Sequence, residues 1–504
     1  MTARALMVQG TASSAGKSIL VTALCRIFRQ DGYRVAPFKA QNMALNSFVT
    51  AAGGEIGRSQ AEQARAAGIE PTVDMNPVLL KPQADNCSQL IVRGKATGTA
   101  DASSYYRDNG RLLPVIRESY NVLAAQYDMI IIEGAGSPAE INLMSKEIAN
   151  MRIAEMAGAP VLLVGDIDRG GVFASLAGTM LLLPPRWRLL VSGFVINKFR
   201  GDISLLKPGL DFLEKRYSRP VLGVIPYFRG LQIAQEDSVY LDERTNRKTK
   251  ECPDICVIRL PHISNYDDFD PLEQSCNVRY IVSAKELGDT DLVILPGTKS
   301  TIDDMGFLIR SGLAKSIIAR ATAGIPVIGI CGGYQMLGKF IHDPGHTESG
   351  SLECRGLGLL DTETIFEPVK ITTRVKAAIH TGAGLFRGMK NITVGGYEIH
   401  MGRDRNKQDR PAFDIIKPDG YHDADGAVNK NGTVFGTYIH GLFDNGDFTG
   451  RLIDNICSLG GLAGVRHKAI DREKSFDELA NVVRSNLNMG KIYDIIAGGK
   501  DGRE

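Results

Sequence analysis

Short runs of apolar residues alternate with amphipathic stretches along the first part of the chain. The first run, Ala5–Val8, is followed after a short loop by apolar residues at helical spacing between Ile19 and Phe28. Near-continuous apolar runs separated by helices are typical of parallel strands that are buried on both faces of a sheet. The pattern predicts a doubly wound α/β domain whose later strands are 34–38, 129–132, 161–165, 189–196 and 221–225.

The alternation stops at 236–253, where the chain is charged and poor in apolar residues, and then begins again. We place a domain boundary at this stretch. The second set of apolar runs predicts another α/β domain, with strands at 255–260, 278–282, 292–295, 327–330 and 434–439. The expected organisation is a first domain at 1–235, a linker at 236–253, a second domain at 254–448, and a helical tail at 449–504 that packs on the second domain.

Length and charge narrow the class of protein. At about 150 residues per domain, 504 residues favour two to four domains. A formal net charge of +2 gives no electrostatic footprint for nucleic acid, so the expected partners are small molecules. No apolar run approaches the length of a membrane span, and the N-terminus has no signal-peptide pattern, so we expect a cytoplasmic protein. The eight cysteines lack a C-x-x-C pair and are expected to be reduced; the oligomeric state does not follow from the sequence.

A glycine-bearing loop, Q-G-T-A-S-S-A-G-K-S at 9–18, joins the first strand to the first helix. At such a junction, backbone N–H groups and the helix dipole converge on one point, and Lys17 adds a full positive charge. The loop is a variant of the usual phosphate-binding pattern, because its first glycine is one residue early. The residues expected to bind the phosphates of ATP are Gly10, Thr11, Gly16, Lys17 and Ser18.

Polar residues follow most of the predicted strands of the first domain, at the sheet edge where ligands bind in such folds. Glu133 is expected to hold Mg²⁺ together with the Ser18 hydroxyl, although an acid at a strand end can also cap a helix. Asn197 and Lys198 are also expected to bind the nucleotide; Asn197 is a candidate to read a purine base, although an ordinary turn explains it nearly as well. Further candidates for the substrate or an interface are Lys39, Gln41, Asn42, Asp166, Asp168 and Arg169, of which the last three could equally form a structural ion pair.

In the second domain the strand at 327–330 delivers Cys331 into a turn of two glycines, at the start of a helix. Such a turn exposes the thiol, and the helix N-terminus favours the thiolate. His440, at the end of a later strand, is the candidate base, and the N–H groups of Gly297 and Gly332 are the candidate oxyanion hole. The pattern indicates a cysteine nucleophile.

Two further stretches of the second domain concentrate polar residues. The string P-H-I-S-N-Y-D-D-F-D-P-L at 261–272 carries three aspartates, and the string at 395–403 places Glu398 and His400 on one face of an extended segment. Both stretches are candidates for the substrate side or an interface. Capping and salt bridges explain them equally well.

The loop at 9–18 resembles that of dethiobiotin synthetase and the related amidoligases, which activate a carboxylate with ATP. The partitioning ATPases carry a second lysine five residues before the first, and this chain has Ala12 there. The motifs around Cys331 and His440 resemble the class I glutamine amidotransferase domain. That domain usually has an acid two residues after the histidine, and this chain has Leu442, so the histidine must be oriented by another group.

Across nearly the whole chain, strings such as F-K-A-Q-N-M-A-L-N-S, D-I-D-R-G-G-V-F-A, N-K-F-R-G-D and G-Y-E-I-H-M-G resemble the amidotransferases of cobalamin synthesis. The resemblance implies amidation of the b, d, e and g carboxylates of adenosylcobyrinic acid a,c-diamide to adenosylcobyric acid, through an acyl phosphate and glutamine-derived ammonia. It implies ATP with Mg²⁺ as co-substrate, a corrinoid acid as substrate, and no tightly bound organic cofactor. One alternative is cobyrinic acid a,c-diamide synthase. The other is a non-catalytic ATP-binding switch with a degenerate glutaminase domain.

Overall fold

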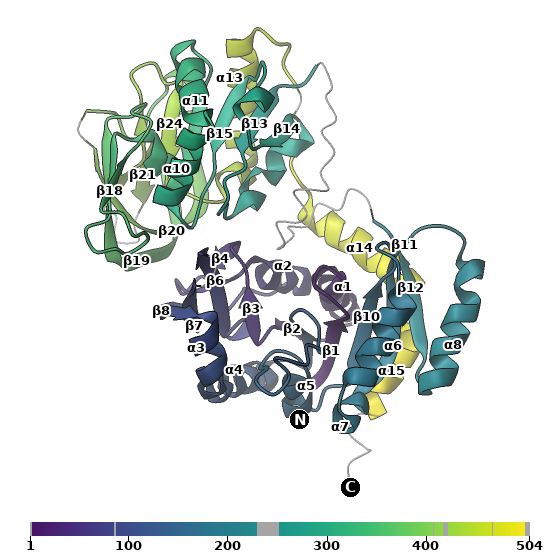
Figure 1. Ribbon diagram of the computed structural model, residues 1–504. Helices are drawn as coiled ribbons and strands as arrows, with labels where there is room; N and C mark the ends of the chain where they lie inside the picture. The colour runs from purple at the N-terminus through teal and green to yellow at the C-terminus, as the bar shows by residue number, and fades with distance from the viewer. Residues whose placement is uncertain are drawn as a thin grey trace. The chain divides into compact units, whose positions relative to one another are not determined.

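The computed structural model describes residues 3–84, 87–228, 251–406, 408–416, 422–465 and 467–498 (Figure 1). The chain forms two compact units, and neither is a single continuous stretch of sequence. The first unit comprises Met1–Ala44, Gly54–Asp237 and Asp471–Glu504, and the second comprises Leu45–Gly53 and Ser238–Ile470. Most of the predicted linker at 236–253 lies outside the described residues. The prediction of two consecutive domains is therefore wrong at two places, residues 45–53 and the C-terminal tail.

A six-stranded parallel sheet forms the centre of the first unit. Its strands, in spatial order, are β12 (Val221–Pro226), β11 (Val191–Phe199), β10 (Val161–Asp166), β1 (Arg4–Gly10), β9 (Met129–Glu133) and β2 (Val35–Phe38). Every neighbouring pair is parallel, and all residues of β9 and β2 are buried. All six strands predicted from the apolar runs are confirmed, because both faces of this sheet are covered.

Helices cover the two faces of this sheet and connect its strands. They are α1 (Lys17–Gln30), α2 (Arg58–Ala67), α3 (Ala102–Asp108), α4 (Leu113–Gln126), α5 (Met151–Ala157), α6 (Val172–Leu182), α7 (Pro185–Arg188) and α8 (Lys207–Tyr217). A smaller sheet of the unit contains β3 (Gln41–Met43), β6 (Val78–Ala84), β7 (Cys87–Val92) and β8 (Lys95–Asp101). The sequence did not predict this sheet, since nearly all of β8 is exposed and lacks an apolar pattern.

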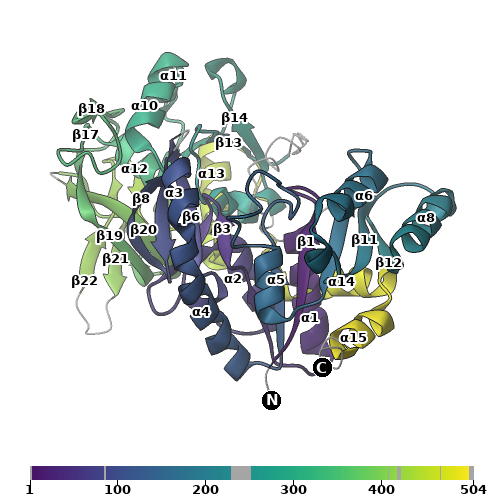
Figure 2. The ribbon, with the colours of Figure 1, turned by 60° about the horizontal axis from the view of Figure 1, so that its bottom comes forward.

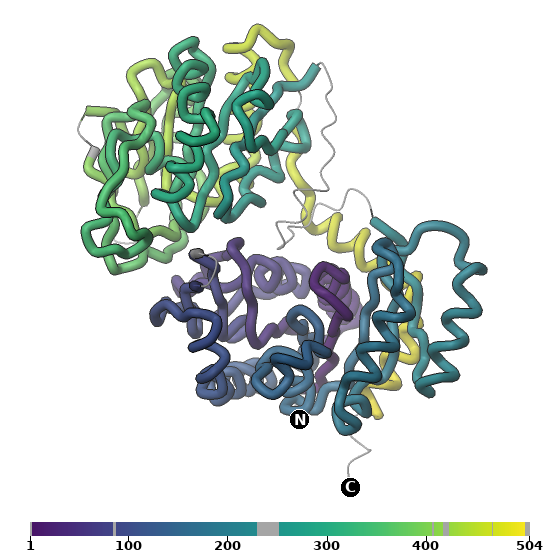
Figure 3. The backbone as a smooth tube through the Cα atoms, in the orientation of Figure 1, coloured from purple at the N-terminus to yellow at the C-terminus, as the bar shows by residue number. Residues whose placement is uncertain are grey.

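The C-terminal tail ends on the first unit, so both ends of the chain lie there (Figure 3). Its helices α14 (Arg472–Asn486) and α15 (Met489–Gly498) lie on the side of the strands β11 and β12 opposite to α6 and α8 (Figures 1 and 2). Phe476, Leu479 and Val483 are buried in the same apolar cluster as the inner face of α1. The prediction that the whole tail packs on the second domain is wrong from residue 471 onward.

Charged contacts also join the tail to α1 and α2. Arg26, within α1, donates to Glu473 and Asp477 at 2.7 Å each. Arg472 lies 3.0 Å from the buried Glu62 carboxylate. Burial alone would raise the pKa of Glu62, but Arg472 and two arginines of α2 lower it to about 2. The first helix of the chain and the last two are thus parts of one core.

The second unit is built on another six-stranded sheet. Its order is β14 (Asn277–Ile281), β13 (Asp254–Ile258), β15 (Leu292–Leu295), β16 (Val327–Ile330), β24 (Val434–Thr437) and β23 (Ala427–Val428), and every pair except the last is parallel. The five predicted strands are confirmed. The helices α10 (Thr301–Arg310), α11 (Leu313–Thr322), α12 (Gly332–Leu337) and α13 (Gly446–Gly460) belong to this unit.

A second, mostly antiparallel sheet of this unit was not predicted. It contains β17 (Phe340–His342), β18 (Glu353–Arg355), β19 (Thr362–Ile379), β20 (Thr393–Asn406), β21 (Phe413–Ile416) and β22 (His422–Asp425). The long strands β19 and β20 pair along most of their length. The extended conformation predicted for 395–403 is confirmed as part of β20.

We expect Leu479→Ala in α14 to destabilise the first unit by about 2–5 kcal/mol, because it removes a fully buried side chain packed against α1. Glu478→Ala is the matched control: its side chain is 64% exposed on the same helix, so its effect should stay within about 0.5 kcal/mol. Calorimetric unfolding of the full-length chain measures both. Equal unfolding temperatures for the two variants would contradict the packing of the tail on α1.

Candidate functional site

The loop after β1 has the geometry of an anion-binding turn. Gly16 has φ of 94° and precedes α1 directly. A Cβ on Gly16 would lie 2.0 Å from Asn197 Nδ2, and a Cβ on Gly10 would lie 3.0 Å from the carbonyl oxygen of Ala12. Thr11 N–H donates to the Val164 carbonyl at 2.9 Å, which fixes the loop to β10. The left-handed backbone therefore favours glycine at position 16, and a side chain at position 10 would be in tight contact with the loop.

Lys17 is buried within this loop, with only 6% of its surface exposed. Its ammonium group donates to the carbonyl oxygens of Ala12 at 2.9 Å and Gly136 at 3.1 Å. Gly136 belongs to the segment that follows β9. The positive charge is thus held between the two segments that leave neighbouring strands, at the edge where the sequence predicted a phosphate site.

Glu133 lies at the end of β9 and is the centre of a buried polar cluster. Its Oε1 accepts from Ser18 Oγ at 2.8 Å and from Lys39 Nζ at 2.9 Å, and its Oε2 accepts from Gln63 Nε2 at 2.5 Å. Burial opposes ionisation, but the Lys39 ammonium and these donors lower the pKa of Glu133 below its ordinary value. The structure brings three predicted residues together, and adds Gln60 and Gln63 of α2, which the sequence analysis missed.

The Ser18–Glu133 pair fits a magnesium ion in its chemistry, since a hydroxyl and a carboxylate oxygen lie 2.8 Å apart. Among the described residues, no group of three or more His, Cys, Asp or Glu side chains could hold a metal ion. Mg²⁺ usually binds proteins through one or two carboxylates and completes its shell with water and phosphate oxygens. Ser18 and Glu133 would supply two protein oxygen ligands, one of them a carboxylate, as such Mg²⁺ sites do.

Asn197 supports the loop from β11. Its Nδ2 donates to the Ala15 carbonyl at 2.9 Å, so the amide donor is used within the protein. Contact with a purine base stays a prediction. The other candidates at this edge form ion pairs: Lys198 lies 2.9 Å from Asp166, and Asp168 lies 3.0 Å from Arg200. The structural role that the sequence left open for both aspartates is therefore present, and their role in binding a substrate stays a prediction.

The remaining candidates of the first unit differ in exposure. Arg169 is exposed. Gln41 Oε1 accepts from the Tyr105 hydroxyl at 2.6 Å, and the buried Asn42 donates to Gln60 Oε1 at 3.0 Å. Asn42 is thereby linked through α2 to the cluster around Glu133.

Cys331 occupies a strained turn between β16 and α12. Its φ of 52° and ψ of −110° are rare for a residue with a side chain, and such strain costs on the order of 1–3 kcal/mol. The turn is held by Cys331 N–H donating to the Thr437 carbonyl at 2.8 Å. The thiol lies 3.7 Å from the Ile399 carbonyl oxygen. This is the sharp strand-to-helix turn that presents a nucleophile.

The turn at Gly297 and Thr298 lies against His440 and against Gly332, the residue that follows Cys331. A Cβ on Gly332 would lie 3.2 Å from Thr298 N, and a Cβ on Gly297 would lie 3.0 Å from His440 Cε1. The two glycines predicted for the oxyanion hole are thus brought to the same place as the histidine. Thr298 N–H is an additional donor that sequence reasoning missed.

His440 is fully buried and is oriented by Asp268. Its Nδ1 lies 2.6 Å from Asp268 Oδ2, while Asp268 Oδ1 accepts from Gly441 N–H at 2.9 Å. An Nδ1–H that donates to Asp268 leaves Nε2 for the thiol. Leu442 stands where the amidotransferase domain usually has an acid; it is 1% exposed and belongs to the apolar core. The sequence signal was the aspartate-rich string at 261–272, whose role had been left open.

The electrostatics of this pair favour a charged histidine. Burial works against the imidazolium, but the Asp268 carboxylate and the neighbouring Cys331 outweigh it and raise the pKa of His440 to about 10. The ring therefore carries a proton at neutral pH. A protonated histidine beside Cys331 can stabilise a thiolate and later release the proton to a leaving group.

The structure separates the roles of Glu398 and His400. His400 is buried and stacks on the Tyr438 ring with 3.7 Å between ring centroids. Burial lowers its pKa to about 4, so it is neutral. Glu398 is half-buried on β20. The residue between them, Ile399, provides the carbonyl near Cys331, and a role of Glu398 or His400 in substrate binding stays a prediction.

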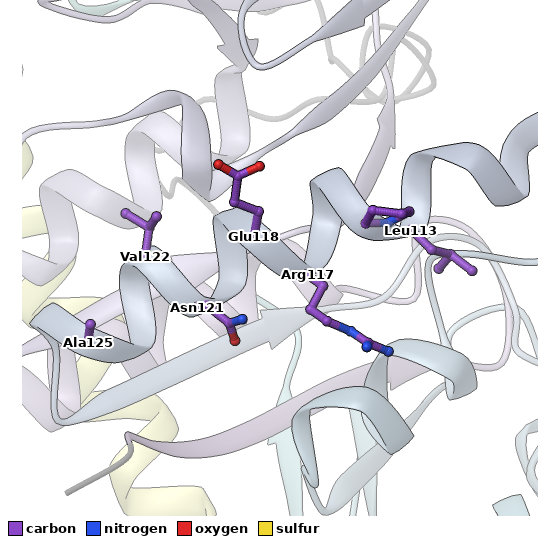
Figure 4. Close-up of a pocket in the computed structure, with 7 residues that line it drawn as sticks. Leu113, Arg117, Glu118, Asn121, Val122 and Ala125 are labelled. Atoms are coloured by element: carbon purple, nitrogen blue, oxygen red, sulfur yellow. The ribbon is translucent and has the colours of Figure 1, made fainter.

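A hollow of about 690 Å³ lies along α4, lined by seven residues of that one helix (Figure 4). Figure 4 shows Glu118 pointing away from Arg117 and Asn121. None of the predicted site residues lines it. Its lining contains no cysteine, serine or histidine.

Two family models match the chain. The CobQ/CobB/MinD/ParA nucleotide binding domain matches residues 6–239, and the CobB/CobQ-like glutamine amidotransferase domain matches residues 254–448. Each match contains one of the two polar clusters. Among the described residues, no helix is both long and apolar enough to cross a membrane.

Curated proteins named cobyric acid synthase are similar to the chain over nearly its whole length. The protein from Dehalococcoides mccartyi (strain ATCC BAA-2266 / KCTC 15142 / 195) is 57% identical over 99% of both chains. That from Pelotomaculum thermopropionicum is 51% identical over 98% of this chain and 97% of its own, and that from Thermoanaerobacter sp. is 49% identical over 98% and 99%. With both domains matched and about half of all residues identical, the chain belongs to the cobyric acid synthase family.

Proposed function

We propose that the protein amidates the b, d, e and g carboxylates of adenosylcobyrinic acid a,c-diamide, with ATP and glutamine as co-substrates, in the cytoplasm. The observation that carries the proposal is the presence of two complementary sites in one chain. One is the loop with Lys17 beside Ser18 and Glu133, and the other is Cys331 with His440. Asp268 removes the reason to regard the thiol site as degenerate, because it orients His440 in the place of an acid at 442.

In the first unit, the loop N–H groups and the Lys17 ammonium bind and orient the polyphosphate of ATP. Ser18 and Glu133 would hold Mg²⁺, which neutralises phosphate charge when it is bound. A carboxylate oxygen of the corrinoid attacks the γ-phosphorus, and ADP leaves. Ammonia then attacks the resulting acyl phosphate at its carbonyl carbon, the amide forms, and inorganic phosphate leaves. Lys17 stabilises the charge that moves onto the phosphate oxygens in the first step.

In the second unit, the Cys331 thiolate attacks the side-chain amide carbon of glutamine. The N–H groups of Gly297, Thr298 and Gly332 are the candidate donors to the oxyanion. His440 gives its Nε2 proton to the leaving nitrogen, and ammonia departs. Water then attacks the thioester, transfers a proton to His440, and releases glutamate with the thiolate restored. The charged state of His440 favours the first of these proton transfers.

Product mass tests the identity of the substrate. Incubated with adenosylcobyrinic acid a,c-diamide, ATP, Mg²⁺ and glutamine, the protein should give a product with four additional amides. A protein that leaves this diamide unchanged, but adds two amides to cobyrinic acid, would instead be an a,c-diamide synthase.

Cys331→Ala should abolish amidation driven by glutamine, with a loss of at least about 10³-fold, and should leave amidation driven by ammonium salts within twofold of the wild type. The alanine removes the nucleophile without touching the first unit. Cys354→Ala, at a partly buried cysteine on β18, is the control and should retain both activities. Glutamine-dependent product formed by Cys331→Ala would show that the nucleophile is another residue.

Lys17→Ala should abolish amidation from both nitrogen sources, because the loop loses the charge that binds the transferred phosphate. Lys207→Ala, at an exposed lysine paired with Asp211, controls for loss of a positive charge in the same unit. ATP binding by calorimetry should weaken only in Lys17→Ala. Ammonia-dependent activity that survives Lys17→Ala would contradict the assignment of this loop.

Asp268→Asn should reduce glutamine hydrolysis by about 10²–10⁴-fold at neutral pH, since the asparagine removes the charge that raises the pKa of His440. In the wild type Asp268 raises the pKa of His440 to about 10, so the ring loses its proton as the pH rises through that value. In the variant burial dominates, the pKa falls, and the alkaline limb of the pH–rate profile moves to lower pH. Asp270→Asn, two residues along, is the control. A profile for Asp268→Asn that overlays the wild type would refute the role of Asp268.

A further inference from the structure

Residues 45–53, here called the strap, come from the N-terminal part of the sequence and belong to the second unit. The strap contains β4 (Ser47–Val49), and all three residues of this strand are buried. It is covalently continuous with β3 on one side and with β5 (Glu55–Gly57) on the other. Residues 1–44 and 54–237 belong to the first unit, so the nine residues of the strap interrupt that unit in the sequence.

Hydrogen bonds and ring contacts hold the strap in the second unit. Ser47 N–H donates to Asn265 Oδ1 at 3.0 Å, and the Ser47 carbonyl accepts from the Tyr397 hydroxyl at 3.2 Å. Arg374 Nε donates to the Val49 carbonyl at 3.0 Å, and its guanidinium lies 5.2 Å from the centroid of the Phe48 ring. Phe48 also meets the Tyr397 ring edge-on, at 5.6 Å. The strap is therefore attached through specific polar and aromatic contacts.

Two of these contacts lead to the catalytic histidine. The Tyr397 ring stacks on the His440 ring, with 5.3 Å between centroids and 18° between planes. The backbones of the two residues also exchange hydrogen bonds of 3.1 and 2.8 Å. Gly396 permits this approach, because a Cβ there would lie 2.4 Å from the His440 carbonyl oxygen. Tyr397 and His440 are thus expected to shift together.

The second contact, between Ser47 and Asn265, leads to His440 through Asp268. Asn265, which accepts from Ser47 N–H, immediately precedes the 3₁₀ helix Tyr266–Gln274 that carries Asp268. The strap therefore touches both the residue that stacks on the His440 ring and the segment that carries its carboxylate partner. A change in the strap would reach the imidazole through two routes.

On the other side, the strap continues into the cluster around Glu133. Asn42, on β3, donates to Gln60, and Gln60 and Gln63 both donate to the Glu133 carboxylate, at 3.5 and 2.5 Å. Asn42 precedes the strap by three residues in the sequence. The chain thus provides a continuous covalent and hydrogen-bonded connection from the phosphate-binding cluster to the strap.

We propose that Tyr397 is a positioning residue for His440, and that the strap sets its position according to the occupancy of the nucleotide site. The proposal rests on the function proposed above. Glutamine hydrolysis would then be fast only when ATP and the corrinoid acid are bound, so ammonia is produced when an acceptor is ready. Such coupling between two sites requires an element that both sites bias, and the strap is that element.

Tyr397→Phe is the test variant, since it removes only the hydroxyl that donates to Ser47 and keeps the stacked ring. Tyr217→Phe is the matched control, because it removes a similar bond, from a tyrosine hydroxyl to the Ala177 carbonyl at 3.1 Å, elsewhere in the protein. Glutamine hydrolysis is measured with and without ATP, Mg²⁺ and adenosylcobyrinic acid a,c-diamide. Ammonia-driven amidation is measured in parallel on the same full-length proteins.

In the wild type and in Tyr217→Phe we expect ATP and the corrinoid acid to raise the kcat of glutamine hydrolysis. In Tyr397→Phe this stimulation should fall at least fivefold, with the KM for glutamine and the ammonia-driven amidation within twofold of the wild type. Phe48→Leu, which loosens the strap without changing Tyr397, should reduce the stimulation in the same direction. A purely structural role would lower all activities of these variants together, and would refute the proposal.

Other outcomes would separate the strap proposal from the proposed function. Full stimulation in Tyr397→Phe, a change confined to KM, or a wild type that amidates with ammonia but is not stimulated, would each overturn the strap proposal and leave the amidation function intact. A wild type that fails to amidate with ammonia, ATP and the diamide would overturn the proposed function itself.

Discussion

His440 lies where no solvent reaches it, and its charge depends on one carboxylate, that of Asp268. Placing an ion pair in the interior costs on the order of several kcal/mol per ion, which is recovered only if the geometry is good and the remaining lone pairs are satisfied. Here the second carboxylate oxygen accepts the Gly441 N–H. The arrangement holds one nitrogen of the ring in place and leaves the other for Cys331. The strained turn, the oxyanion donors and the stacked tyrosine are useful only around an imidazole fixed in this way.

The first unit also contains a buried charged group, but there the charge is negative and belongs to Glu133. Glu133 is buried, and its charge is retained because Lys39 and several neutral donors surround it. The donors come from α1, from α2 and from the residue that follows β2, so the carboxylate joins these three parts of the unit. A buried charge that is fully hydrogen-bonded makes the position of the site specific, even where it adds little to stability.

Local patterns predicted the sheets but not the contacts between distant segments. Eleven of the twelve strands in the two central sheets could be recognised, because most of them are short apolar runs buried on both faces. The strands β8 and β19 could not, since exposed residues dilute their pattern. Cys331, Lys17 and Glu133 could be proposed as site residues because each lies in a local string near a strand end. Asp268 was not assigned, because its partner is 172 residues away and the local string gives no direction.

The tail shows the same limit. The string Ser475–Glu478 has the spacing of a capping box, yet α14 begins at Arg472, where Asp471 accepts from Lys474 N–H. Ser475 instead lies within the helix and is buried. Both residue types cap helices, and only tertiary contacts decide between them.

The order of the segments has a consequence for how the two units can exist. The chain passes from one unit to the other at residues 44–45, 53–54, 237–238 and 470–471. A cut between the two matched domains would leave the second unit without the strap, exposing Tyr397 and Asn265 where Ser47 now binds. It would also leave the first unit without α14 and α15, exposing the apolar face of α1. The two candidate sites therefore lie on separate sheets. Neither unit is complete without a segment that the chain supplies after it has crossed to the other unit.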